Sequence, residues 1–93
     1  MSIAAPRPRP VIGRAVIEAG VQDILRGQLK IEVASADEDI IEGGLLDSLS
    51  LVDLIFHLES LFGVETRLED LEPANFASVT AITAYVEGRL GAR

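Results

Sequence analysis

Apolar residues recur at intervals of three and four positions in three stretches of the chain, at about residues 11–29, 48–62 and 79–90. This spacing places apolar side chains along one face of an α-helix. Between the stretches lie Gly63, Pro73 and long polar segments that do not continue the pattern. The pattern therefore predicts three amphipathic helices joined by irregular connections.

The first and last predicted helices each have a single apolar face. In the first it consists of Ile17, Val21, Ile24, Leu25 and Leu29, and in the last of Val79, Ile82, Tyr85, Val86 and Leu90. Gly20 and Gly27 each weaken the first helix by roughly 1 kcal/mol relative to alanine, so packing must hold it. Ser78 is a suitable N-cap for the last helix, and Gly91 lies just past its predicted end.

The middle helix, predicted at residues 48–62, is apolar on two sides. Its core stripe is predicted to contain Leu51, Leu54, Ile55, Leu58, Leu61 and Phe62. A second stripe contains Leu49, Val52 and Phe56, with Asp53, His57 and Ser60 beside it. A helix of this kind is either enclosed by other elements or presents one side to a partner. We interpret the second stripe as a docking surface, with packing inside the bundle as the alternative.

The connections complete an all-α prediction: a small bundle of three main helices and one short helix. A long loop at residues 30–46 joins the first two helices, and its anchors are predicted to be Ile31, Val33, Ile40, Ile41, Leu45 and Leu46. The cluster Asp37, Glu38 and Asp39 is expected to face water. Residues 67–75 are predicted to form a short helix or turn broken by Pro73. Residues 1–10, rich in proline and arginine, are predicted to be a disordered tail preceding a domain at 11–93.

Composition excludes several classes of protein. Ninety-three residues suffice for one small domain. The chain has no cysteine and a single histidine, His57, so we predict no metal site. The acidic cluster lacks the glycine that a calcium-binding EF-hand loop requires. No stretch of 18 apolar residues exists, so we predict no membrane association and a cytoplasmic monomer.

Negative charge is concentrated in the middle of the chain. The net charge is −7, but residues 32–72 contain twelve acidic residues and one basic residue, a local balance of −11. Such a surface repels nucleic acid. Two interpretations stay open: a solvated acidic face that maintains solubility, or steering of basic partners toward this region.

Asp47 and Ser48 stand where the middle helix begins. Short polar side chains cap helix N-termini, and the positive end of the helix dipole favours a phosphodiester. A plain cap is the alternative. Ser48 and His57 cannot form a catalytic pair, because nine residues of helix separate them by about 13 Å. We predict no catalytic residues and no enzymatic activity.

Residues 44–64, GLLDSLSLVDLIFHLESLFGV, resemble the modification-site helix of acyl and peptidyl carrier proteins. The resemblance extends over about residues 17–90. It implies a carrier-protein domain in which a phosphopantetheinyl transferase, with coenzyme A and Mg²⁺, attaches 4′-phosphopantetheine to Ser48. Asp47 would assist recognition by the transferase, and Leu49 would lie beside the arm. An adenylating amino acid or acyl ligase and a downstream transferase would dock on Leu49, Val52, Asp53, Phe56, His57 and Ser60.

Departures from fatty-acid carriers favour an amino acid cargo. Leu45 and Leu46 replace the usual Gly-Ala before the aspartate, and Ser50 and Ser60 stand where those carriers have acids. The Leu-Leu-Asp-Ser sequence looks more like D-alanyl and stand-alone aminoacyl or peptidyl carriers. The alternatives are a fatty-acid or polyketide acyl carrier, or an unmodified acidic protein-interaction module.

Overall fold

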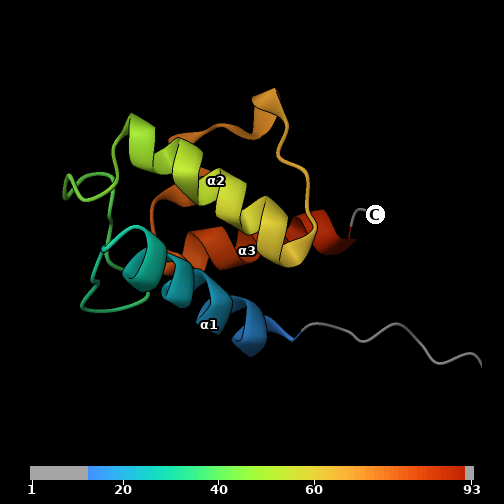
Figure 1. The fold of residues 1–93 in the computed structure, drawn as a ribbon, viewed down its shortest axis with the longest axis horizontal. Helices are drawn as coiled ribbons and strands as arrows, with labels where there is room; N and C mark the ends of the chain where they lie inside the picture. The colour runs from blue at the N-terminus through green and yellow to red at the C-terminus, as the bar shows by residue number, and fades with distance from the viewer. Residues whose placement is uncertain (1–12, 92–93) are drawn as a thin grey trace, which may run out of the picture.

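The computed structural model describes residues 13–91, and regular structure in this part of the chain is entirely helical (Figure 1). The predicted all-α bundle is confirmed. The elements are α1 (Arg14–Asp23), η1 (Ile24–Gln28), α2 (Ser48–Phe62), η2 (Leu68–Asp70), η3 (Pro73–Phe76) and α3 (Val79–Gly91). The predicted proline- and arginine-rich tail lies outside the described residues. None of the described helices has the length and apolar character needed to cross a membrane.

Three helices and the long loop enclose one apolar core. α1 packs mainly against α3, and α2 contacts both η1 and α3 (Figure 1). The fully buried residues come from every part of the bundle: Ile17, Val21, Ile40, Leu54, Leu58, Phe76, Val79, Ile82, Thr83 and Val86. On α2 the prediction that Leu61 is part of the core is wrong, because its side chain is 56% exposed. Leu51 and Ile55 are partly buried.

The first helix differs from its predicted extent. α1 begins at Arg14, and it gives way after Asp23 to the wider π-helical turn η1. The wide turn places the neighbouring residues Ile24 and Leu25 both in the core. Lys30 then adopts a positive φ of 58°, and the chain turns back so that the Ile31 N–H donates to the Leu25 carbonyl at 2.7 Å. Val11, the predicted first residue, lies outside the described residues.

The connections are anchored by fewer apolar residues than predicted. In the long loop Ile31, Ile40 and Leu46 are buried. Val33 and Ile41 are partly buried against the core, so only Leu45, which is 41% exposed, fails as a predicted anchor. The turn or short helix predicted at residues 67–75, broken by Pro73, is present as two 3-10 turns, η2 and η3, and Pro73 is the first residue of the second.

α3 begins as predicted and fastens the connection that precedes it. The Ser78 hydroxyl accepts a hydrogen bond from the Ala81 N–H at 3.0 Å, which confirms this N-cap. The Tyr85 hydroxyl donates to Asp70 at 3.2 Å, and the Tyr85 ring lies 5.2 Å from that of buried Phe76. These contacts hold η2 and η3 against α3.

The crossing of α1 and α2 requires a residue without a side chain at Gly20. A Cβ atom there would lie 2.7 Å from Cζ of Phe62 and 3.2 Å from Cδ2 of Leu61. Gly88, on α3, has no such neighbour. Glycine lowers the stability of a helix, and at Gly20 the close packing of α1 on α2 offsets this loss. At Gly88 no such packing offsets it.

We predict opposite effects for two glycine-to-alanine substitutions. Gly88→Ala should raise the free energy of unfolding by up to about 1 kcal/mol through helix propensity. Gly20→Ala should lower it by about 1–2 kcal/mol, because the buried Phe62 ring must move. Chemical denaturation of both variants checks this, and stabilisation by Gly20→Ala would contradict the close approach.

Candidate functional site

Ser48 is the first residue of α2, and its side chain is exposed. The residue before it, Asp47, is extended (φ −105°, ψ −174°), and its Oδ1 accepts a hydrogen bond from the Ser50 N–H at 2.8 Å. Gly44, at φ 76°, makes the turn that leads into this cap. Asp47, rather than Ser48, is therefore the N-cap, which leaves the Ser48 hydroxyl available.

The electrostatics of this end of α2 favour an anion. The unpaired N–H groups of the first turn and the helix dipole supply partial positive charge beside Ser48. The backbone N–H of Ser50 donates to the Asp47 carboxylate and holds the pKa of that group below its ordinary value. Asp47 thus stays ionised and capping across the physiological pH range.

A mostly apolar cleft of about 290 Å³ lies directly beside Ser48. It runs between the start of α2, the end of the long loop and the connection to η3. Its lining residues are Ile41, Leu46, Asp47, Ser48, Leu51, Leu71 and Pro73. An alkyl chain attached to the Ser48 oxygen would find apolar surface within reach.

The second apolar stripe of α2 is exposed to solvent. Leu49 is 82% exposed, Val52 65% and Phe56 61%. Asp53 and Ser60 are exposed as well. The structure therefore brings most of the predicted partner residues onto one surface, next to Ser48. Leu68 in η2 is also 86% exposed, and the sequence pattern did not single it out because a three-residue turn is too short to show a repeat.

His57 lies apart from the centre of this stripe. It is half-buried, and its ring meets that of Phe56 edge-on with centroids 5.4 Å apart. With Ser60 and Leu61 it lines a different cleft, of about 420 Å³, between α2 and the end of α1. Ser60 thus lies between the exposed stripe of α2 and this cleft.

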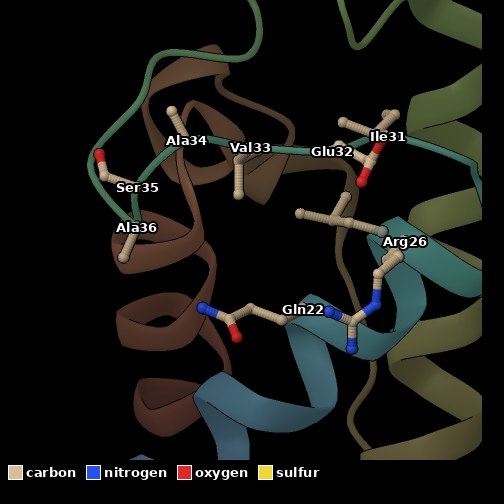
Figure 2. Close-up of a pocket in the computed structure, with 9 residues that line it drawn as sticks. Gln22, Arg26, Ile31, Glu32, Val33, Ala34, Ser35 and Ala36 are labelled. Atoms are coloured by element: carbon tan, nitrogen blue, oxygen red, sulfur yellow. The ribbon is translucent and has the colours of Figure 1, made fainter.

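A third cavity, of about 180 Å³, separates η1 and the end of α1 from residues 31–36. Figure 2 shows Gln22 and Arg26 on one side of this cavity and the extended segment of residues 31–36 on the other. None of its lining residues lines the cleft beside Ser48. Asp23 binds Arg26 at 3.1 Å, so the guanidinium is already neutralised within the chain.

Comparison with known families assigns the class of the protein. Residues 19–86 match the family described as phosphopantetheine attachment site, and this segment includes α2, the long loop and most of α3. The chain belongs to this family. It is a carrier protein whose cofactor is 4′-phosphopantetheine. An exposed serine at a helix N-terminus, beside a partly apolar cleft, fits an arm attached through a phosphodiester.

The chain is also similar to D-alanyl carrier proteins. It is 34% identical over 55 residues to the one from Leuconostoc citreum (strain KM20), which covers 59% of this chain and 70% of that protein. It is 39% identical over 51 residues to that of Streptococcus pyogenes serotype M5 (strain Manfredo), covering 55% of this chain and 65% of that protein. Carrier proteins in general work with a transferase and ligases, and the family is generally non-catalytic.

We predict that the side chain of Asp47 stabilises the fold as the N-cap of α2, independently of any function of Ser48. Asp47→Ala should lower the melting temperature by about 5 °C, whereas Asp47→Asn should retain most of the cap. Because the folded-state pKa of Asp47 is lowered, its contribution is present above the ordinary aspartate pKa and is lost as pH falls through the folded value. Thermal melts between acid and neutral pH measure both effects. Equal melting temperatures for the alanine variant and the wild type at neutral pH would show that the cap does not matter.

Proposed function

We propose that Ser48 is the attachment point of 4′-phosphopantetheine. The observation that carries this proposal is the exposed Ser48 hydroxyl on the first residue of α2, inside the segment that matches the family. Asp47 supports the assignment, because it takes over the capping role that Ser48 would otherwise fill. Ser50, the nearest other serine, donates its backbone N–H to Asp47 and is half-buried.

The attachment is a phosphoryl transfer from coenzyme A, catalysed by a separate phosphopantetheinyl transferase with Mg²⁺. The Ser48 oxygen attacks the phosphorus that bears pantetheine, the pyrophosphate P–O bond breaks, and 3′,5′-adenosine diphosphate leaves. The hydroxyl proton passes to a base of the transferase. The bound group supplies a terminal thiol that holds the cargo as a thioester, so the chain needs no cysteine of its own.

We propose that the cargo is an amino acid. The similarity to D-alanyl carrier proteins supports this choice, as does Leu45-Leu46 in front of Asp47. An adenylating ligase would load the amino acid, and a downstream transferase would remove it.

Both enzymes would dock on the exposed stripe of Leu49, Val52 and Phe56. The stripe begins one residue after Ser48, so a partner seated on it has the arm within reach. Asp53 and Ser60 border the stripe, and His57 contributes through the edge of its ring on Phe56.

Substitution of Ser48 tests the attachment point. Ser48→Ala should abolish the mass gain of one phosphopantetheinyl group after incubation with transferase, Mg²⁺ and coenzyme A, while the fold is retained because Asp47 supplies the cap. Ser50→Ala is the matched control and should be modified normally. Modification of the Ser48→Ala variant would overturn the assignment. An unmodified wild type, under conditions that modify a known carrier, would favour the unmodified interaction module.

Two phenylalanines of the same chain separate docking from stability. Phe56→Ala should lower the free energy of unfolding by about 0.5 kcal/mol, since the ring is 61% exposed, but should slow loading by the ligase. Phe76→Ala should instead cost ~3–5 kcal/mol, because its ring is fully buried. Denaturation and loading rates are measured on both variants. A normal loading rate for Phe56→Ala would exclude Phe56 from the docking surface.

A further inference from the structure

The long loop that leads to Ser48 is tied by its backbone to the start of α3. The Ile40 N–H donates to the Ala77 carbonyl at 2.7 Å, and the Thr80 N–H donates to the Ala36 carbonyl at 3.0 Å. The Ile40 carbonyl in turn accepts the N–H groups of Leu45 and Leu46, both at 2.9 Å. A continuous path of hydrogen bonds thus runs from Ala77, just before α3, through Ile40 to the residue before Asp47.

Three neighbouring carboxylates reinforce this path. Glu38 accepts the Ala34 N–H at 2.5 Å, and Asp37 accepts the Thr80 hydroxyl at 2.8 Å. Asp39 accepts the N–H groups of Ile41 at 3.1 Å and Glu42 at 2.8 Å. Figure 2 shows the beginning of this loop, where Ala34, Ser35 and Ala36 follow the extended segment. The acidic cluster, expected from the sequence to face water, therefore has a structural role even though Asp37 and Asp39 are exposed.

The partners of these carboxylates are neutral donors. In the described part of the chain the four arginines form their ion pairs with other acids: Arg14 with Glu87, Arg26 with Asp23, Arg67 with Glu69 and Arg89 with Asp70. A neutral donor needs an acceptor oxygen, and an amide oxygen accepts the same hydrogen bond as a carboxylate. The geometry of the loop therefore requires the oxygens of Asp37, Glu38 and Asp39 rather than their charge.

We propose that Asp37, Glu38 and Asp39 are positioning residues that hold the loop, and through Ile40 the start of α2, in the conformation that the phosphopantetheinyl transferase recognises at Ser48. This inference rests on the proposed attachment at Ser48. When the oxygens are lost, the transferase must reorder the loop on binding. The free energy of this ordering weakens binding of the carrier and raises its KM. When only the charge is lost, the loop keeps its conformation.

Two triple variants separate the oxygens from the charge. Asp37→Asn, Glu38→Gln and Asp39→Asn together remove three charges and keep the acceptors. Asp37→Ala, Glu38→Ala and Asp39→Ala together remove both. The rate at which the transferase modifies each variant is measured with Mg²⁺ and saturating coenzyme A while the concentration of the carrier is varied. Amide hydrogen exchange is measured at Leu45 and Leu46 of the same variants.

The amide triple variant should stay within about twofold of the wild type in KM and kcat, since its hydrogen bonds persist. The alanine triple variant should raise KM at least roughly fivefold with kcat little changed, and it should lower the exchange protection of Leu45 and Leu46 at least roughly fivefold, the factor that one lost hydrogen bond is worth. An equal rise in KM for both variants would overturn the proposal, because it would show that charge is what the transferase reads. An unchanged KM for the alanine variant would overturn it as well.

A second pair of variants covers the case in which the alanine triple variant does not fold. Thr80→Val removes the donor to Asp37, whereas Thr80→Ser keeps it. Only Thr80→Val should raise KM and lower the exchange protection; equal behaviour of the two variants would contradict the inference. A wild-type chain that the transferase does not modify would overturn the proposed function and with it the role at Ser48. The exchange measurements would then still decide whether the carboxylates hold the loop.

Discussion

The position at which α2 begins is the constraint on which the site depends. It is set from both directions along the chain. Asp47 caps the helix through Ser50, and the buried Ile40 binds the backbone of Leu45 and Leu46 just before the cap. A start one residue later would place Ser48 in the capping position and engage its hydroxyl with the N–H groups of the first turn. The same constraint therefore determines whether the Ser48 hydroxyl is available.

α2 serves two surfaces at once. Leu54, Leu58 and Phe62 hold it in the bundle, while Leu49 and Phe56 remain in water on the opposite side. Exposed apolar groups of this size contribute little to the stability of an isolated domain, and contiguous ones indicate interaction surfaces. The bundle thus packs one face of α2 into the core and leaves the opposite face, next to Ser48, exposed to solvent.

The sequence was sufficient for the elements whose signals are local. The bounds of α2, the cap at Ser78 and the exposure of Val52 follow from helical period and cap chemistry, and the structure agrees with them. The features that the sequence did not predict depend on tertiary context. Leu61 follows the helical period of the core, yet it lies at the edge of the core stripe, where it borders Gly20 of α1 and the cleft beside it and stays 56% exposed. The hydrogen bond between Thr80 and Asp37 joins residues far apart in sequence, so no local pattern predicts it. The π-helical turn η1 is local, but the helical period of residues 11–29 does not distinguish it from a continuing α-helix.

The central claim, that the free end of α2 carries the cofactor, is tested most directly by tandem mass spectrometry of the protein purified from its native cells. Proteolysis between the acidic loop and α2 yields a peptide that contains both Ser48 and Ser50, and fragmentation locates the modification between them. We predict phosphopantetheine on Ser48, with an amino acid on its thiol in the loaded fraction. Phosphopantetheine on Ser50, or on a serine outside α2, would contradict the claim.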